Sequence, residues 1–445
     1  MSLLRRWLDP IRSRWFFNRP FRQRRLSSRD GITVYLRFDD AYSYLLVQLL
    51  PELEELLNPQ LKPLKIMLCS QASPRPNGLS ERAWQHYMLD DARALAAQHR
   101  FIFDNKNNQV PSSALIQQAQ DILKLSPLRG LDSLNLLQDL FHMLWQQQQG
   151  KLNTLHYMAT RRQPALSRTD HKSADNQNAG LKDSGSVIIR FVDEPIHTAF
   201  LLFGGRHYRA IDDFLRLTRR LKQQKLLNNE PIFLINHIEW GEHLVSDPEL
   251  LNDIQALHAT LDIYLALEDP ISWLILAYIK RELVDYYNLD LRVHPLPYQG
   301  RDDFDWALVA RLARRTEVAF APFCRPTQTG VLNLASILFD IESEARSDAL
   351  LSMLHGIWCK GRDADFVLHL QQFRSVLCNP KSNPNSVPDL EQAQAQAWLD
   401  ANQLDCQAYQ QPDLPLMVLQ IGQQQHVFNS LYRVWRIESL LTASA

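Results

Sequence analysis

The chain has 445 residues and a mass of 51.7 kDa, which is larger than one hydrophobic core usually supports and predicts two or three domains of about 150 residues each. With 45% hydrophobic and 22% charged residues, its composition is that of a soluble globular protein and excludes a disordered or fibrous chain. Because 48 Lys and Arg balance 49 Asp and Glu, the molecule as a whole has no charge with which to bind nucleic acid. Any basic surface must be local.

The cysteines indicate a reducing compartment. There are five, they are widely spaced and none forms a C-x-x-C motif, so neither a disulfide scaffold, a dithiol redox centre nor a zinc knuckle is expected: Cys69, Cys324, Cys359, Cys378 and Cys406. The longest apolar runs, such as residues 271–279, are shorter than the roughly 18 residues that cross a bilayer, and the first residues lack the apolar core of a signal peptide. We therefore expect a cytoplasmic protein.

Residues 1–30 form a basic and aromatic arm. Nine arginines alternate with five aromatic residues: Arg5, Arg6, Arg12, Arg14, Arg19, Arg22, Arg24, Arg25 and Arg29, with Trp7, Trp15, Phe16, Phe17 and Phe21. Such a segment is typical either of contact with an anionic membrane surface or phosphates, or of an arm whose aromatic residues pack on its own protein. Both interpretations stay open.

Residues 31–227 are predicted to form a first α/β domain. The apolar segment 32–38 predicts a strand, and the polar D-D-A-Y-S that follows leads into a helix that reaches about Leu57 with Pro51 inside it. The pattern then predicts a strand at 64–69, helices within 80–97 and 112–160, an exposed loop at 161–185, strands at 187–192 and 198–203 around the Gly204-Gly205 turn, and a basic helix at 211–227. The helical region is an insertion that separates the strands.

After a connector at 228–258, residues 259–445 repeat this order. A strand at 261–267 runs into a helix, a strand follows at 291–296, and a long helical region extends to about Phe373. Aligning D-A-Y-S-Y-L with D-P-I-S-W-L pairs Asp40 with Asp269 and Ser43 with Ser272, both 229 residues apart. Late in each half the order strand, turn, strand, basic helix also recurs. Because several elements recur in sequence order, we expect a tandem duplication.

Several segments resemble the DSBA-like thioredoxin family, in its branch of 2-hydroxychromene-2-carboxylate isomerases and kappa-class glutathione transferases. V-Y-L-R-F-D-D-A-Y-S-Y-L and I-Y-L-A-L-E-D-P-I-S-W-L are similar to that family's strand ending in Ser-Pro-Tyr-Ser-Tyr/Trp-Leu. I-W-C-K-G-R-D, L-P-L-M-V-L and Y-R-V-W-R-I-E resemble later family motifs in the second half, and G-G-R-H-Y-R-A-I-D-D resembles one in the first. The resemblance covers most of residues 32–441 and implies an α/β fold of two thioredoxin-like domains, each with a helical insertion.

The resemblance also implies a glutathione site, in which a serine at the start of the first helix meets the cofactor's sulfur. The matching positions here are Asp40 and Asp269, with Ser43 and Ser272 one turn later. A carboxylate beside a thiol raises the thiol pKa by like-charge repulsion, so thiolate activation is not expected there. An Asp at this point is also an ordinary helix N-cap, and a Ser one turn on is either a donor to a ligand or a small packing residue.

The family's other cofactor contacts are a cis-proline loop and an Asp-Arg corner. The resemblance places Pro415 at the proline position of the second half and Thr198 at that of the first, with Pro195 three residues earlier. The Asp-Arg pair becomes Asp212-Asp213 in the first half and Tyr432-Arg433 in the second. The implied cofactor contacts are therefore Pro415, Arg433, Asp212 and Thr198.

Two further segments carry charged residues of the kind that bind ions. H-I-E-W-G-E-H, residues 237–243, contains two histidines and two carboxylates, but its spacing is not H-E-x-x-H and Gly241 interrupts a helix face, so no metal site is predicted. The basic face of the helix within 211–227 is either solvated surface or a patch for an anion or a membrane: Arg216, Arg219, Arg220, Lys222 and Lys225.

Two hypotheses for function follow. The first is a glutathione-dependent isomerase or transferase-like protein without dithiol chemistry, acting on a small molecule, with an activity that is degenerate at one or both sites. The alternative is a non-catalytic binding or scaffold protein that keeps the tandem thioredoxin fold, and Asp40 and Asp269 favour it. The fold alone does not decide between them, and the substrate and oligomeric state are not encoded in any motif.

Overall fold

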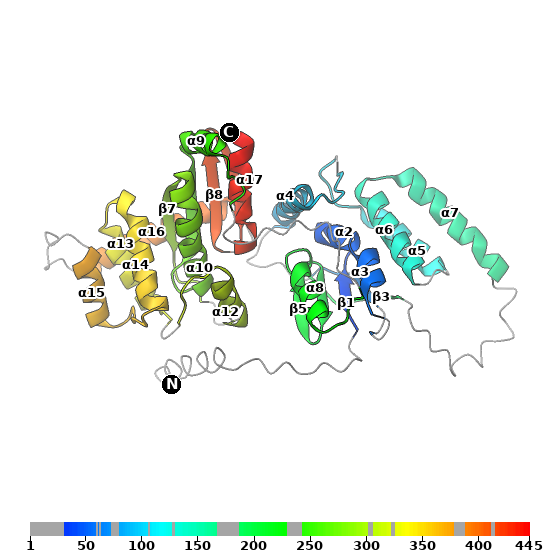
Figure 1. The fold of residues 1–445 in the computed structure, drawn as a ribbon, viewed down its shortest axis with the longest axis horizontal. Coiled ribbons are helices and arrows are strands. Elements are labelled where there is room, and N and C mark those ends of the chain that lie inside the picture. The colour runs from blue at the N-terminus through cyan, green and yellow to red at the C-terminus, as the bar shows by residue number, and fades with distance from the viewer. Residues whose placement is uncertain are drawn as a thin grey trace. The chain divides into compact units, whose positions relative to one another are not determined.

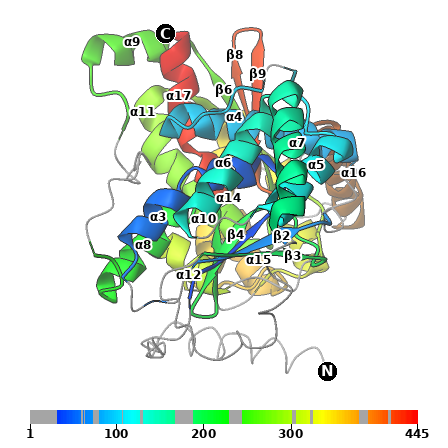
Figure 2. The same ribbon diagram turned by 90° about the vertical axis from the view of Figure 1, so that its right-hand side faces the viewer.

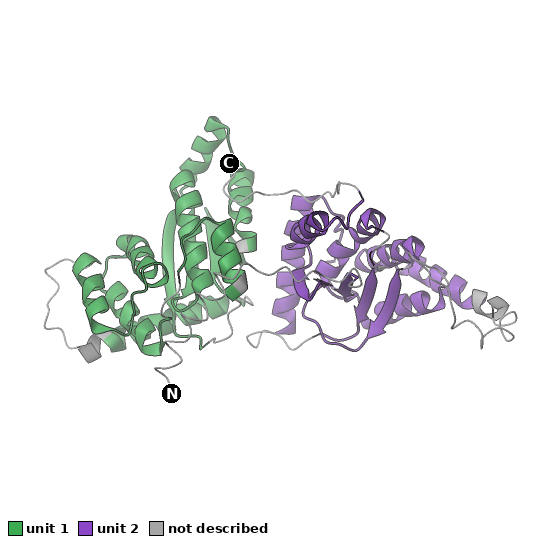
Figure 3. Ribbon diagram, turned by 60° about the horizontal axis from the view of Figure 1, so that its bottom comes forward, with its two compact units in different colours: residues 1–22, 238–445 green, residues 23–237 purple. Residues whose placement is uncertain are grey.

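The computed structural model describes most of the chain, namely residues 31–58, 61, 64–72, 80–105, 107–126, 130–166, 187–228, 243–300, 306–321, 325–377, 388–410 and 414–445. The chain divides into two compact units, Gln23–His237 and Met1–Arg22 with Ile238–Ala445 (Figure 3). We call them the N-terminal unit (purple) and the C-terminal unit (green). The predicted basic arm, residues 1–30, lies outside the described residues.

The N-terminal unit is built on a five-stranded mixed sheet (Figure 1). Its strands are β1 (Thr33–Leu36), β2 (Lys65–Cys69), β3 (Ile188–Val192), β4 (Phe200–Phe203) and β5 (Arg206–Arg209). Their order is β3-β2-β1-β4-β5. β1, β2 and β3 are parallel, β4 is antiparallel to β1, and β5 is antiparallel to β4. Val34 and Leu36 of β1 are fully buried, and alternation with half-exposed neighbours gives the strand its period of two.

The helices of this unit are α2 (Ala41–Val47), α3 (Leu50–Leu56), α4 (Glu81–His99), α5 (Ser113–Leu125), α6 (Leu131–Trp145), α7 (Gln149–Leu166) and α8 (Phe214–Gln223). The predicted helix that contains Pro51 is two helices, because proline is tolerated in a first turn and not in a helix interior; it lies in the first turn of α3. In the insertion, α5, α6 and α7 lie side by side (Figure 2). α7 runs to Leu166, so the predicted loop begins later than residue 161, and its remainder lies outside the described residues.

Three contacts hold α2 in place at the end of β1. The Trp145 indole of α6 donates to the Phe38 carbonyl (3.1 Å), the Tyr42 hydroxyl donates to Asp91 of α4 (2.8 Å), and the Ala41 amide contacts the Met88 sulfur of α4 (3.4 Å). The helical insertion therefore fixes the turn that carries Asp40.

The C-terminal unit has a four-stranded sheet of order β7-β6-β8-β9. Its strands are β6 (Thr260–Ala266), β7 (Asp290–Leu296), β8 (Leu416–Ile421) and β9 (Gln424–Asn429). β6 and β7 are parallel, β8 is antiparallel to β6, and β9 is antiparallel to β8. One face of β6 presents Leu261, Ile263 and Leu265 to the main core, and the other presents Tyr264 to a small cluster with Cys406.

The helices of the C-terminal unit are α9 (Pro248–Ala256), α10 (Pro270–Ile279) continued by a π-helical turn and α11 (Asp285–Tyr287), α12 (Trp306–Arg315), α13 (Gln328–Phe339), α14 (Arg346–Trp358), α15 (Val367–Leu377), α16 (Pro388–Ala408) and α17 (Trp435–Ser444). α9 lies inside the predicted connector, and α16 follows the predicted end of the helical region at Phe373. The signal for α16 is present in its Ala-, Gln- and Leu-rich sequence after Pro388. No described helix is long and apolar enough to span a membrane.

Both units are thioredoxin-like, as predicted. Each has a parallel β-α-β pair whose first strand also pairs with an antiparallel hairpin, a helix after the hairpin, and a helical insertion between the second strand and the hairpin. The N-terminal unit adds β3 at the edge next to β2. In both units the first helix starts where β1 or β6 ends, which is the point where the candidate residues lie.

Candidate functional site

Asp40 is the N-cap of α2, directly after β1. Its backbone is extended, and its Oδ2 accepts a hydrogen bond from the Ser43 amide at 3.0 Å. The interpretation of Asp40 as a helix cap is confirmed. A cap carboxylate satisfies an amide that has no partner inside the helix and interacts favourably with the helix dipole.

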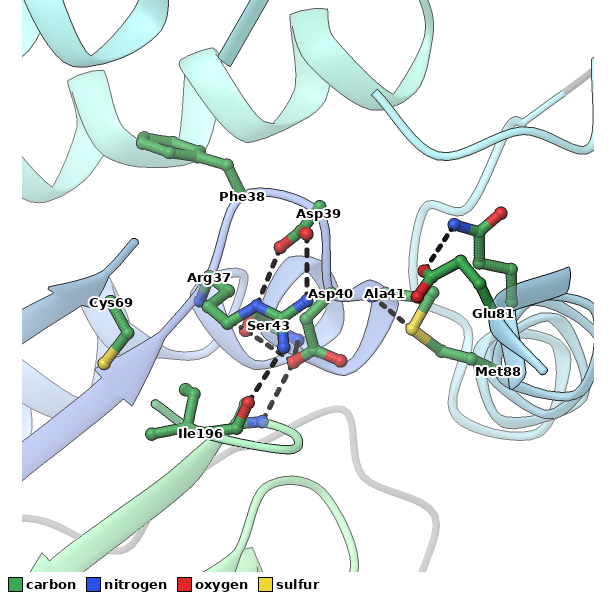
Figure 4. Close-up of polar contacts among 12 residues, drawn as sticks. Arg37, Phe38, Asp39, Asp40, Ala41, Ser43, Cys69, Glu81, Met88 and Ile196 are labelled. Carbon is green, nitrogen blue, oxygen red and sulfur yellow. Dashed lines mark hydrogen bonds and ion pairs between the residues drawn. The ribbon is translucent and has the colours of Figure 1, made fainter. Parts of the chain in front are cut away.

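The same carboxylate oxygen has two further donors. The Ser43 hydroxyl donates to Asp40 Oδ2 at 2.6 Å, and the backbone amide of Ala199, in the segment that enters β4, donates at 2.9 Å (Figure 4). Asp40 is completely buried, and its Oδ1 has no hydrogen-bond partner among the described residues. Burial raises the pKa of Asp40, and the bonds from Ser43 and Ala199 and the charge of Arg37 only partly oppose it. Asp40 is a clamp between α2 and the start of β4.

Arg37 fastens the same corner from a second side. Its side chain is buried, holds the Asp39 carboxylate with two bonds of 2.8 and 2.9 Å, and donates to the Ile196 carbonyl at 2.8 Å (Figure 4). The backbone amide of Arg37, directly after β1, donates to the Ser43 hydroxyl oxygen at 3.0 Å. That hydroxyl therefore accepts a hydrogen bond from Arg37 and donates one to Asp40. The hydroxyl hydrogen of Ser43 is therefore already donated to a protein acceptor, Asp40 Oδ2.

Arg37, Asp39, Ile196 and Ala199 are parts of this corner that the sequence did not single out. Arg37 could have been recognised from the sequence, because a charged residue at the end of an otherwise apolar strand must find a partner when it is buried. The two backbone groups have no signal, since any residue type supplies an amide or a carbonyl.

Asp269 occupies the matching place in the C-terminal unit, as the N-cap of α10. Its Oδ1 accepts from the Ile271 amide at 2.8 Å, and the Ser272 hydroxyl lies 3.4 Å from its Oδ2. Asp269 and Ser272 are both buried. The neighbouring Glu268 is also buried and accepts from the Gln299 amide at 2.7 Å, which ties the end of β6 to the loop after β7.

The strand registers show which residue of the N-terminal unit corresponds to Pro415. Tyr35 pairs with Phe200, and the matching Tyr264 pairs with Leu416. Pro415, whose bond to Leu414 is cis, therefore corresponds to Ala199, and the predicted equivalence with Thr198 is wrong by one residue. The physical consequence is direct: Ala199 has the amide that clamps Asp40, whereas proline has none.

The hairpin registers also align the two Asp-Arg corners. Phe200 pairs with Arg209 and Leu416 with Asn429, so Asp213 corresponds to Arg433 and Asp212 to Tyr432, as the sequence predicted. Asp213 is buried and accepts from the Arg209 amide and the Arg216 side chain, both at 3.0 Å, whereas Asp212 is half-buried. Arg433 is buried, and its Nη1 donates to the Tyr432 carbonyl at 3.2 Å.

The described thiols are not poised for redox chemistry. Burial raises the pKa of Cys69, Cys359 and Cys406, each to about 11. A reactive cysteine needs the opposite shift, because the thiolate is the nucleophile. Cys324 and Cys378 lie outside the described residues.

No group of three or more potential metal ligands occurs among the described residues. Of the segment 237–243, only His243 is described: its Nδ1 lies 3.1 Å from the buried Glu438 carboxylate, and its ring stacks on Tyr286 with centroids 3.7 Å apart. His243 thus packs against α11 and α17.

No known protein-family profile matches the sequence, and no curated protein matches it. Solved structures that match part of the chain include 2-hydroxychromene-2-carboxylate isomerase, at 14% identity and a TM-score of 0.31 over 41% of this chain and 95% of that chain. The cytosolic disulfide reductase DsbM from Pseudomonas aeruginosa matches at 12% identity and a TM-score of 0.34 over 41% of this chain and 95% of that chain. A structure of DsbM with GSH matches at 11% identity and a TM-score of 0.32, over 41% of this chain and 96% of that one.

Proposed function

We propose that this chain is a non-catalytic binding or scaffold protein that keeps a tandem thioredoxin fold, derived by duplication from a DSBA-like ancestor of the glutathione-dependent isomerase and transferase kind. The sequence motifs support the ancestry. The state of the N-terminal site supports the loss of catalysis.

One observation carries this proposal: Asp40 stands where the resemblance places the serine that meets the glutathione sulfur, and it is a buried structural clamp. Its Oδ2 receives the Ser43 amide, the Ser43 hydroxyl and the Ala199 amide. The donors that would stabilise a thiolate at a helix start are thus already bonded to a carboxylate, which repels a second anion. A site built in this way stabilises the fold instead of a reacting sulfur.

A second candidate function belongs to the C-terminal unit alone: glutathione binding, with isomerase or transferase chemistry. The observation in its favour is that Pro415 has no amide with which to make to Asp269 the bond that Ala199 makes to Asp40. Arg433 also remains at the corner where the resemblance places a cofactor contact. Asp269 itself opposes thiolate formation there.

Calorimetric titration of the full chain with glutathione, together with an insulin-reduction assay and a glutathione-dependent isomerisation assay, separates the two candidates. The non-catalytic proposal predicts no turnover in either assay. Turnover that is lost on Asp40→Asn would overturn it at the N-terminal site. Saturable glutathione binding by the wild type with an increased thiolate absorbance in Asp269→Ser would instead establish the second candidate, because Ser removes the like charge and supplies a hydroxyl donor.

The insulin-reduction assay has an internal control in the substitution of single cysteines. Because no C-x-x-C motif exists, any reduction that a single cysteine substitution abolishes would show that a thiol of the chain reacts despite the raised pKa values of the described cysteines. We expect none above the rate of glutathione alone.

A further inference from the structure

The hairpin strand β5 and the helix α8 that packs beside it carry a basic face on the N-terminal unit (Figure 1). We define the basic face as the five exposed residues Arg206, Arg209, Arg219, Lys222 and Lys225, together with the half-buried Arg216 and Arg220. α8 buries Phe214, Leu217 and Leu221 on its inner side, so its charged side chains lie on the outer side. Within residues 206–225 the only carboxylates are Asp212 and Asp213.

Asp213 is buried against β5 and offsets the charge of Arg216, with which it forms an ion pair of 3.0 Å. It accepts from the Arg209 amide and from Arg216, and Arg216 also donates to the His207 carbonyl at 2.8 Å. The Asp213 amide donates to the Arg209 carbonyl at 2.9 Å. These bonds close most of the outer edge of β5, so this edge is not open for an added strand, and a partner must bind through the side chains.

Aromatic rings hold two guanidinium groups of the basic face in position. Arg216 lies over the Tyr208 ring at 4.4 Å, and Arg220 lies 5.8 Å from the Phe203 ring centroid. Arg220 also donates to the Tyr208 hydroxyl at 3.1 Å. Stacking on rings lowers the entropy that these side chains lose when they meet an anion.

The charge of the whole chain is divided unevenly. Residues 206–225 carry seven basic and two acidic side chains, and residues 1–30 carry nine arginines and two aspartates, while the net charge of the complete chain is only −1. All other segments together are therefore acidic. Residues 1–30 join the described part of the chain at Gly31, which leads into β1; β1 pairs with β4, and β4 pairs with β5.

We propose that the basic face docks on an anionic lipid surface. The charge of the face matches phosphate-bearing headgroups, and the acidic remainder of the chain orients the molecule with this face toward the membrane. The sequence of residues 1–30 favours a lipid surface over a nucleic acid, since Trp and Phe among arginines are typical of membrane interfaces. This inference is independent of the proposed function, because no residue of the basic face belongs to the Asp40 or Asp269 site.

Vesicle co-sedimentation of the full chain tests the proposal. The probe is a vesicle of phosphatidylcholine with phosphatidylserine, compared with phosphatidylcholine alone, at low and at physiological salt. The wild type is expected to bind only the anionic vesicles, and more weakly as salt rises. Arg219→Gln, Lys222→Gln and Lys225→Gln combined should weaken binding roughly a hundredfold, since each charge near the surface contributes a factor of about five.

The matched control removes three exposed basic residues elsewhere in the same unit: Arg82→Gln, Lys151→Gln and Arg190→Gln, of which Arg190 lies on β3 at the opposite edge of the sheet. It should bind like the wild type, and circular dichroism checks that both triple variants are folded. An equal loss of vesicle binding in both triple variants would overturn the proposal. It would also be overturned if the first variant bound like the wild type while deletion of residues 1–30 abolished binding. Binding of single-stranded RNA without binding of anionic vesicles would overturn it in favour of a nucleic-acid surface.

Discussion

The two units place an aspartate at the same point of the same fold and use it differently. In the N-terminal unit Asp40 accepts three hydrogen bonds, one of them from Ala199 across the sheet, and Arg37 ties the same corner to Ile196. In the C-terminal unit Asp269 caps α10 through Ile271, with Ser272 at the longer distance of 3.4 Å, and the residue that corresponds to Ala199 is Pro415, directly before β8. Ala199 supplies an amide that joins Asp40 to the start of β4, and Pro415 has no such amide.

This difference shows what one backbone amide contributes to the corner at the start of α2. A proline in front of β4 would leave the Asp40 carboxylate without a donor from that strand, whereas an alanine supplies an amide that the carboxylate binds. Once bound, the carboxylate is buried and held by its donors. The amide of residue 199 therefore adds to the stability of the corner.

The largest effect is expected for Asp40→Ala. The substitution leaves the Ser43 amide, the Ser43 hydroxyl and the Ala199 amide buried without their acceptor, which should cost about 3 kcal/mol in the free energy of opening this unit. Hydrogen exchange measured peptide by peptide reports the loss over α2 and β4. Peptides over α10 and β8 in the same molecule are the internal control, and Ser112→Ala, which removes the exposed N-cap of α5, should cost only about 1 kcal/mol.

Ala199→Pro tests the comparison from the other side. It installs the residue type of the C-terminal unit and removes one donor to Asp40, which should cost about 2 kcal/mol in the same exchange measurement. Ala199→Gly keeps the amide and should cost about 1 kcal/mol or less. Equal losses in the two variants would mean that the amide of residue 199 contributes nothing and that the clamp is not the source of the difference.

The free energy of unfolding of the N-terminal unit should depend on pH through Asp40. Because burial raises the pKa of Asp40 in the folded protein, the folded state binds its proton more tightly than the unfolded chain does. Protonated Asp40 therefore adds to the free energy of unfolding. This contribution is complete below the pKa that Asp40 has in the unfolded chain, and it is lost as the pH rises through the pKa that Asp40 has in the folded protein. Asp40→Asn removes that dependence.

The check is the difference in opening free energy between the wild type and Asp40→Asn, followed from acid to neutral pH by exchange over α2. The advantage of the wild type should shrink as the pH rises. An advantage that grows with pH would show that the ionised form is the more stable one in the folded protein, and that Asp40 is a conventional charged cap.

The sequence predicted the fold well and the site only in part. Recurrent apolar strands predicted two α/β units, because strand periodicity and helix N-caps are local properties, and the resemblance to the DSBA-like family implied that both are thioredoxin-like. The clamp was not predictable, since it depends on the strand register that brings Ala199 to Asp40, and a one-residue error placed Thr198 there instead. The split at Pro51 was predictable from the proline itself, while α16 was missed although its composition favours a helix.

The smallest effects are expected at Asp269. If it is a cap and not a clamp, Asp269→Ala should cost about 1 kcal/mol and Asp269→Ser only a few tenths, because a serine hydroxyl accepts the Ile271 amide nearly as well as a carboxylate does. Exchange over α10 measures both, and α2 is now the internal control. A loss near that of Asp40→Ala would show that Asp269 also joins two elements and would end the contrast between the units. A fall in glutathione affinity for both variants at unchanged stability would identify the carboxylate as a ligand contact.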